Sequence, residues 1–274
     1  MDTLLQALIM GIVQGLTEFL PISSSGHLIV VPFLLDADDV FLNSLAFSVM
    51  LHVGTVFALL AYFWKDWARL IPAGLAALRD RSFRGDPDRR LAWLLAASTI
   101  PGGIAALLFE DVIETTFRHV GLVAVTLLIG AAILWLADRW GGRRRAIADL
   151  TFPIAVMIGA AQAVALIPGI SRSGISISAG RFAGLDRESA ARFSFLMATP
   201  ITAAAGLYQA WKLVGGDAGV ELSAAPLIAG MLAALVSGFL AIHALLRFLR
   251  TRSLDVFVAY RIGLAAVVLI VWMS

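Results

Sequence analysis

Ionisable and hydroxyl side chains gather in two short stretches of an otherwise apolar chain. The first stretch runs from Gln14 through Glu18 into the sequence PISSSGH, which ends at His27. The second is the sequence PGISRSG, at 168–174, which contains Arg172. Backbone N–H groups in Ser- and Gly-rich turns at helix starts suit an anion, and the forked guanidinium of arginine matches phosphate oxygens. These residue types therefore indicate phosphate chemistry.

Four side chains are the candidate catalytic groups. His27 is a base or a nucleophile toward phosphorus, and Ser24 is an alternative nucleophile that His27 would activate. Glu18 would orient a partner, carry a proton or bind a metal, while Arg172 would hold phosphate oxygens. A single acidic side chain argues against a two-metal mechanism. Further substrate contacts are expected from neighbouring polar and small residues, namely Gln14, Ser23, Ser25, Gly26, Gly169, Ser171 and Ser173.

Other polar residues of the apolar segments have structural interpretations. His52 is expected to be a satisfied polar group of a helix, because polar side chains in membrane helices commonly bond within the bundle. Arg261 is expected to pair structurally or to extend toward a helix end. His243 receives no role, and the three arginines at 143–145 are interpreted as an anchor to lipid headgroups.

The elements that must position the candidate residues are membrane helices. Of the 274 residues, 60% are hydrophobic and 15% are charged, and the mean hydropathy is +0.89. Since soluble domains carry about 25% charged residues, this composition predicts a polytopic membrane protein. The net charge of +2 does not indicate nucleic-acid binding, because the basic residues flank the apolar segments. The absence of cysteine excludes disulfides, thiolate metal sites and cysteine nucleophiles.

Six apolar segments are long enough to cross a hydrocarbon core of about 30 Å as helices. Two further segments, 4–35 and 152–185, are interrupted by the polar turns 21–27 and 168–174. Irregular backbone at membrane depth requires protein or water around it, so each interrupted segment is expected to be a re-entrant hairpin whose tip lines a cavity. The fold class is therefore all-α, with six transmembrane helices at 45–64, 91–109, 120–137, 193–211, 224–246 and 256–273.

The two polar stretches belong to an internal repeat. A shift of 148 positions aligns GIVQGLTEFLPISSSG, at 11–26, with GAAQAVALIPGISRSG, at 159–174, and Gly, Gln, Ile, Ser, Ser and Gly coincide without a gap. The chain is thus predicted to be one membrane domain made of two units, 1–140 and 148–274. Each unit has one hairpin and three crossings, and this odd number inverts the second unit and brings both hairpins together near the midplane.

The distribution of basic residues predicts the orientation. Seventeen of the 21 Lys and Arg residues lie in segments that the odd crossing number places on one side, and only Arg118 and Lys212 lie on the other. Because loops rich in Lys and Arg stay in the cytoplasm, both termini are predicted to be extracytoplasmic. The four basic segments are 65–90, 138–151, 181–192 and 247–255.

The two polar motifs also carry a family resemblance. QGLTEFLPISSSGH at 14–27 and PGISRSG at 168–174, with FSFLMATP at 193–200 and AYR at 259–261, are similar to segments of the bacterial undecaprenyl-diphosphate phosphatases associated with bacitracin resistance. The resemblance covers essentially the whole chain. It implies hydrolysis of the C55 isoprenoid diphosphate to undecaprenyl phosphate and inorganic phosphate, which recycles the lipid carrier of cell-wall synthesis.

The resemblance further implies a divalent cation, Mg²⁺ or Ca²⁺, and a location in the bacterial plasma membrane with the site open to the outer face. The family motif has Glu or Gln at the position of Gln14, and the neutral amide here leaves Glu18 as the main acidic metal ligand. The implied partners are a polyprenyl diphosphate and membrane lipids, without nucleic acid, and a homodimer is left open. From the architecture alone, the alternative is a secondary transporter or flippase with an anion site at the midplane.

Overall fold

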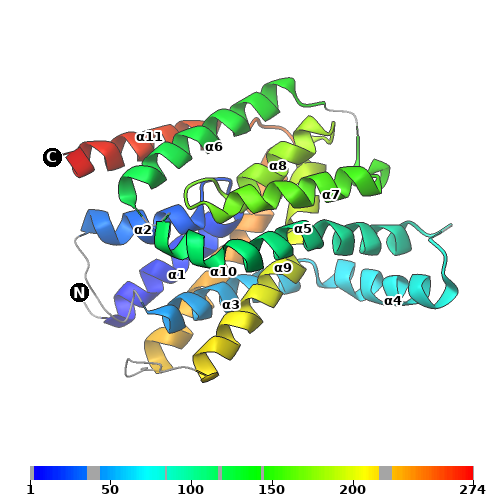
Figure 1. Cartoon of the computed structure of the whole chain (residues 1–274), viewed down its shortest axis with the longest axis horizontal. Helices are drawn as coiled ribbons and strands as arrows, with labels where there is room; N and C mark the ends of the chain where they lie inside the picture. The colour runs from blue at the N-terminus through cyan, green and yellow to red at the C-terminus, as the bar shows by residue number, and fades with distance from the viewer. Residues whose placement is uncertain are drawn as a thin grey trace.

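The computed structural model describes residues 3–35, 44–83, 85–116, 119–142, 145–215 and 224–273. Within these ranges the regular structure is helical, and the only β-type pairing is an isolated bridge between Arg145 and Leu185. Figure 1 shows most helices running side by side along the long axis of the molecule. The elements are α1 (Thr3–Phe19), α2 (Ser24–Leu35), α3 (Leu45–Tyr62), α4 (Trp64–Asp80), α5 (Pro87–Thr116), α6 (Val120–Trp140), η1 (Ile147–Asp149), α7 (Phe152–Ala161), η2 (Gln162–Leu166), α8 (Arg172–Phe182), α9 (Arg187–Gly215), α10 (Ala224–Leu249) and α11 (Asp255–Met273).

The predicted all-α membrane fold is confirmed at the level of helices. Five helices of the described residues, α5, α6, α9, α10 and α11, are long and apolar enough to cross a membrane, and they coincide with five predicted spans. The sixth predicted span, 45–64, corresponds to α3. This helix satisfies the same criteria only together with α4, to which it is joined through a bend of 81° at Phe63.

Helix α4 was not expected, since the segment from 65 to 90 was interpreted as a charged loop. The helix is amphipathic: Leu70 and Ala77, seven residues apart, are buried, whereas Leu75 and Leu78 are exposed. It packs along α5, where Trp93 Nε1 donates to the carbonyl of residue 74 at 3.1 Å. Lys65, Arg69 and Arg79 therefore lie on a helix that packs along α5.

Both predicted interruptions are breaks between helices. Helix α1 ends at Phe19 and α2 begins at Ser24, so the break overlaps the first part of the predicted turn 21–27, whose last residues already belong to α2. In the second segment, α7 tightens into the 3₁₀ helix η2 before the chain turns and α8 begins at Arg172. A proline opens each polar motif, and proline disfavours helical backbone in the residue before it.

Close contacts between small residues attach the two hairpins to distant helices. At Gly11 of α1, a Cβ atom would lie 2.3 Å from the Gly230 carbonyl oxygen of α10. At Gly159 of α7, a Cβ atom would lie 1.9 Å from the Ser98 carbonyl oxygen of α5. Only glycine permits such backbone contacts, which are the usual means of close helix packing in membranes. The hairpins thereby gain rigid supports outside their own sequence neighbourhood.

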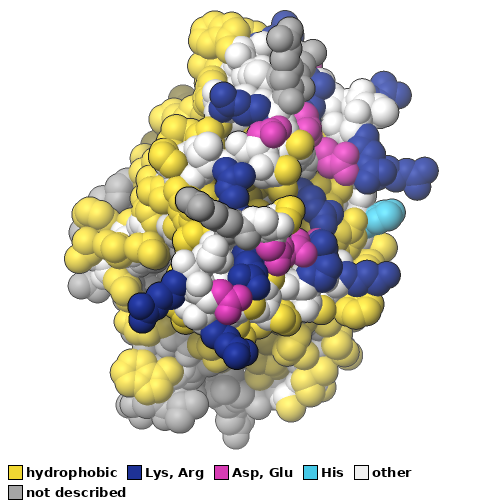
Figure 2. All heavy atoms as spheres, turned by 90° about the vertical axis from the view of Figure 1, so that its right-hand side faces the viewer, with side chains coloured by type: hydrophobic (Ala, Val, Ile, Leu, Met, Phe, Trp, Pro, Cys, Tyr) yellow, Lys and Arg dark blue, Asp and Glu magenta, His cyan; other side chains and the backbone are white. Residues whose placement is uncertain are grey.

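The charged side chains gather at one end of the bundle (Figure 2), where basic and acidic groups alternate over the surface. At this end Asp138 accepts hydrogen bonds from Arg187 Nε at 2.6 Å and from Leu254 N at 3.1 Å. Further ion pairs join Asp66 to Arg192 and Glu188 to Arg250. Helix α1 begins and α11 ends at the opposite end of the molecule (Figure 1).

Candidate active site

The two helix breaks end in the same backbone geometry. Ser23 and Ser171 each have a φ of 77°, a left-handed conformation that is uncommon for residues with a side chain. Each serine hydroxyl accepts a hydrogen bond from the amide three residues later, Gly26 N at 3.3 Å and Gly174 N at 3.1 Å. These serines cap α2 and α8, and N–H groups at helix starts are suited to binding an anion.

The two tips contact each other directly. Ser23 Oγ accepts a hydrogen bond from Gly169 N at 3.2 Å, and Ser173 Oγ donates to the Leu20 carbonyl at 3.0 Å. Segments about 150 residues apart in the chain therefore form one polar cluster. Six predicted binding residues lie in it, namely Ser23, Ser25, Gly26, Gly169, Ser171 and Ser173.

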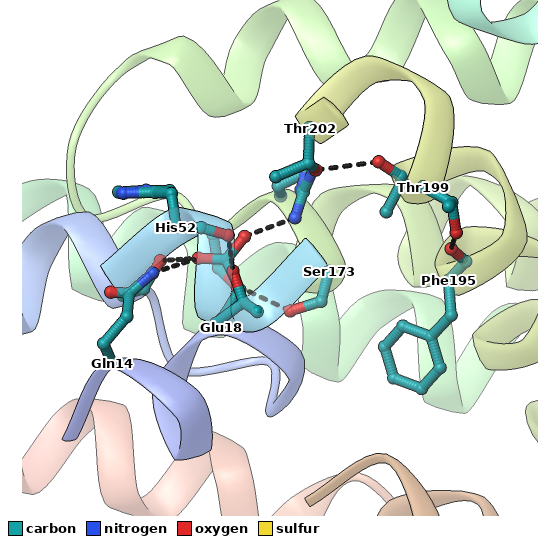
Figure 3. Close-up of polar contacts among 12 residues, drawn as sticks. Gln14, Glu18, His52, Ser173, Phe195, Thr199 and Thr202 are labelled. Carbon is teal, nitrogen blue, oxygen red and sulfur yellow. Dashed lines mark hydrogen bonds and ion pairs between the residues drawn. The ribbon is translucent and has the colours of Figure 1, made fainter. Parts of the chain in front are cut away.

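Glu18 is the centre of the polar contacts in Figure 3. Its Oε2 accepts hydrogen bonds from Ser24 Oγ at 2.6 Å and from Gln14 Nε2 at 3.2 Å, and its Oε1 forms an ion pair with Arg172 Nη2. The Glu18 side chain is buried, while that of Arg172 is partly exposed. Four predicted site residues thus meet at one carboxylate, contributed by α1 and by the first residues of α2 and α8.

Thr202 is a member of the site that sequence reasoning missed. Its Oγ1 accepts a hydrogen bond from Arg172 Nη1 and donates to the Ala198 carbonyl at 2.7 Å. The guanidinium is therefore held between α1 and α9. The sequence of an apolar span does not show which helix face a threonine occupies. Thr202 therefore could not be distinguished from the other hydroxyl residues of the span.

His27 has partners other than those expected. Its Nδ1 bonds to the Ser23 carbonyl at 2.7 Å, and its Nε2 bonds to the Tyr260 hydroxyl at 2.7 Å. The imidazole and phenol rings stack with centroids 5.7 Å apart. Ser24 donates to Glu18, so the expected activation of Ser24 by His27 is not the arrangement in this structure. The two residues nevertheless share the first turn of α2, at a spacing that places side chains on one helix face.

Arg261 has a structural position between the two tips. The side chain is fully buried, and its donors reach the backbone carbonyls of Pro21 at 3.4 Å, Gly169 at 2.6 Å and Ile170 at 3.0 Å, as well as that of Leu127 on α6 at 3.2 Å. Buried carbonyls and a buried guanidinium satisfy one another here. Arg261 thus joins the first tip, the second tip and α6.

The two other histidines have local partners. His52 lies beside Gln14 and Glu18 in Figure 3, and its Nδ1 bonds to the Ser48 carbonyl at 2.8 Å, one helical turn earlier. This bond agrees with the expectation of a satisfied helix polar group. His243 is 3.4 Å from the Tyr62 hydroxyl in a contact among exposed side chains.

The donor set near Glu18 is compatible with a divalent cation held largely by a substrate. Gln14 Oε1 is buried without a hydrogen-bond partner, and carboxylate, amide and hydroxyl oxygens are the ligands that Mg²⁺ and Ca²⁺ prefer. In the described part of the chain no cluster of three or more His, Cys, Asp or Glu residues is placed to bind a metal. Because Mg²⁺ commonly combines one or two carboxylates with substrate phosphates, Gln14 and Glu18 are the residues that would hold such a cation.

Comparisons with known proteins identify the family of this chain. Residues 7–267 match the family model described as bacitracin resistance protein BacA. Relatives named undecaprenyl-diphosphatase include those of Desulforudis audaxviator, 43% identical over 97% of both chains, and Gemmatimonas aurantiaca, 46% identical over 97% of both chains. A relative of the same name from Moorella thermoacetica is 45% identical over 98% of both chains. With a family match over nearly its whole length, this chain belongs to the BacA bacitracin resistance family.

Proposed function

We propose that this protein hydrolyses undecaprenyl diphosphate to undecaprenyl phosphate and inorganic phosphate. The name that its relatives share supports this activity. The observation that carries the proposal is the cluster of Glu18, Ser24 and Arg172 at the point where the helix starts of α2 and α8 meet. This cluster combines an acceptor for a proton, a hydroxyl nucleophile and a cation for phosphate oxygens.

The terminal phosphate binds to Arg172 and to the N–H groups at the starts of α2 and α8. Arginine provides two parallel donors to phosphate oxygens, and helix starts add N–H groups and the positive end of the helix dipole. Both kinds of donor are fixed before the substrate arrives, since Thr202 holds Arg172 and the serine caps hold the turns. Fixed donors stabilise developing charge without having to reorganise during the reaction.

The hydroxyl of Ser24 is the nucleophile that the geometry favours. Its hydrogen bond to Glu18 Oε2, 2.6 Å long, directs its proton toward a carboxylate. As Ser24 Oγ bonds to the terminal phosphorus, the proton moves to Glu18, and the bridging oxygen leaves with undecaprenyl phosphate. Water then attacks the phosphoserine, Glu18 returns its proton to Ser24 Oγ, and inorganic phosphate is released. His27, on the same turn of α2, would accept the proton that the attacking water loses.

A divalent cation, Mg²⁺ or Ca²⁺, belongs to this proposal. Gln14 Oε1 and Glu18 would hold it, and it would neutralise negative charge on the diphosphate oxygens. Chelation should abolish phosphate release, and added Mg²⁺ or Ca²⁺ should restore it. In Gln14→Ala the cation concentration needed for half-maximal rate should rise. Equal activity with and without chelator would contradict the requirement.

We also propose that α1–α2 and α7–α8 are re-entrant hairpins of two inverted units, 1–140 and 148–274. The equivalent backbone of Ser23 and Ser171, 148 residues apart, supports the repeat. So does the reciprocal packing of the hairpins, because α1 lies on α10 of the second unit and α7 lies on α5 of the first. An odd number of crossings in each unit would then invert their orientations.

The proposed location is the plasma membrane, with the charged end of Figure 2 in the cytoplasm and both termini outside. Since the chain has no cysteine, single cysteines at Arg81 and at His119 report their side without background. An impermeant thiol reagent should label the residue-119 variant in intact cells and the residue-81 variant only after permeabilisation. Labelling of both variants in intact cells would contradict this topology.

The activity itself is tested with purified protein and a detergent-solubilised prenyl diphosphate. Release of one inorganic phosphate per substrate, with prenyl monophosphate as the other product, is the expected result. The matched control is Arg172→Lys, which retains the positive charge without the forked donors. Binding of the diphosphate without any release of phosphate would instead favour a transporter or flippase.

A further inference from the structure

The contact between His27 and Tyr260 has a consequence for proton transfer. A carbonyl oxygen only accepts hydrogen bonds, so the bond to the Ser23 carbonyl requires a proton on His27 Nδ1. In the neutral ring Nε2 then carries the lone pair and accepts a hydrogen bond from the Tyr260 hydroxyl. Both ring nitrogens are therefore engaged, one by a peptide group that exchanges no proton and the other by a phenol that can.

The two side chains differ in burial. His27 is buried, with 4% of its surface exposed, whereas Tyr260 is 46% exposed. The stacked phenol lies against the imidazole and occupies the nitrogen through which His27 would gain or lose a proton. A proton that reaches Nε2 must displace the hydroxyl of Tyr260 or pass through it.

We propose that Tyr260 is a positioning residue that relays protons to and from Nε2 of His27. In the relay, a proton from a water or phosphate hydroxyl bonds to the Tyr260 oxygen while the phenol's own proton moves to Nε2. The phenol is unchanged in charge, the donor has lost one proton, and the imidazole has gained one. The reverse transfer restores the neutral ring. This inference rests on the proposed function only for its effect on rate, because the relay itself is a property of the pair.

The charged and titratable groups around the pair leave this path open. Arg261, the next residue on α11, is the charged side chain whose field acts on His27. Its donors are directed to backbone carbonyls, so it fixes the tips and takes no part in the transfer. Tyr260 is the titratable group in direct contact with the imidazole.

Tyr260→Phe removes the hydroxyl and retains the stacked ring. The chain has only three tyrosines, and Tyr62, which contacts His243, supplies the matched control Tyr62→Phe. We expect kcat for phosphate release to fall on the order of tenfold or more in Tyr260→Phe with KM little changed, because acid–base assistance is worth that much or more. Tyr62→Phe should retain the wild-type kcat. A kcat for Tyr260→Phe within twofold of that control would overturn the relay.

A change in the acidity of the Tyr260 phenol, made with little change in its shape, distinguishes proton relay from a purely structural role. In a Tyr62→Phe, Tyr208→Phe background, biosynthetic incorporation of a fluorinated tyrosine alters Tyr260 alone. Ionised phenol cannot donate a proton, so the alkaline limb of the kcat profile should move to lower pH with the fluorinated residue. An unmoved alkaline limb overturns the relay.

A measurement that needs no activity separates this inference from the proposed function. With ¹⁵N-labelled histidine and the His27 signals assigned through His27→Gln, NMR line shapes report exchange between the neutral and protonated ring. Exchange at His27 should be slower in Tyr260→Phe than in Tyr62→Phe. Slower exchange in protein that releases no phosphate would retain the relay and reject the enzyme, whereas equal exchange overturns the relay.

Discussion

Glu18 and Thr202 bind different nitrogens of the same guanidinium, Nη2 and Nη1 of Arg172. The carboxylate comes from α1 and the hydroxyl from α9, so a single side chain joins three parts of the fold. This arrangement fixes the plane of the guanidinium in the absence of substrate. Substitutions at Glu18, Arg172 and Thr202 therefore test separately the charge of the carboxylate, the geometry of the guanidinium donors and the anchoring of the guanidinium.

Arg172→Lys tests the geometry of the donor. An ammonium group is a point charge and cannot reproduce the planar fork that binds Glu18, Thr202 and phosphate oxygens together. We expect a loss of turnover of roughly a hundredfold or more, the usual size of an effect from a lost oxyanion donor. Phosphate release is the measurement, and Arg250→Lys is the control, because Arg250 pairs with Glu188 at the exposed, charged end. Similar rates in both variants would remove Arg172 from the site.

Thr202→Val tests the anchor of Arg172. The substitution conserves shape and removes one hydrogen bond, worth about 1 kcal/mol or roughly fivefold. Loss of this hydrogen bond should mainly raise the KM for the diphosphate substrate, because Arg172 would then occupy several orientations. Thr199→Val on the same helix is the control, because its hydroxyl bonds only to the Phe195 carbonyl. A larger effect at Thr199 than at Thr202 would contradict the anchoring role.

Glu18→Gln tests the proton acceptor. The amide preserves the contacts in shape but binds the Ser24 proton poorly, so turnover should fall by roughly a hundredfold or more. Arg172 loses its ionic partner and retains Thr202, so the variant should still extract as folded protein. Glu188→Gln is the matched control at the charged end. Combining Glu18→Gln with His27→Ala should reduce phosphate release little further if the two groups serve one step. Rates within a few fold of wild type would reject this hairpin as the catalytic half.

Gly130→Ala tests the structural role of Arg261. An added Cβ at Gly130 would lie 1.9 Å from Arg261 Nη2, in the space from which Arg261 reaches the second tip. Overpacking of this kind costs about 1–3 kcal/mol, so the melting temperature should fall. Gly263→Ala, on α11, is the control, because nothing lies within 4 Å of its added Cβ. Equal melting temperatures for the two alanine variants would show that Arg261 does not require this space.

The positions of the helix breaks were predictable because the residues there act locally. Proline and consecutive small polar residues interrupt an apolar helix wherever it lies, and both breaks occur where the motifs PISSSGH and PGISRSG predicted them. The sequence predicted that the tips carrying Glu18 and Arg172 would lie close together near the midplane, because the two polar stretches are similar. It did not predict the direct ion pair between these two side chains.

The positions of Thr202, Tyr260 and α4 were not predictable from local pattern. Whether a hydroxyl on a long apolar helix faces the site depends on how that helix rotates about its axis, and packing against other helices decides the rotation. Tyr260 belongs to the motif AYR, but nothing in the sequence indicates that it contacts a histidine 233 positions earlier. Helix α4 was missed because the segment 65–90 contains many charged residues, and the spacing of Leu70 and Ala77 alone is a weak helical pattern.

The glycine contact between α1 and α10 also sets an order of assembly during synthesis. The surface that receives Gly11 includes Gly230, so α1 cannot take its final position until the last quarter of the chain has been made. At roughly 5 to 20 residues per second, translation of the intervening segment lasts on the order of ten seconds or more. Throughout that interval the helix that carries Glu18 lacks its permanent support, and the cell's insertion machinery must accommodate an acidic side chain whose basic partner emerges only with α8.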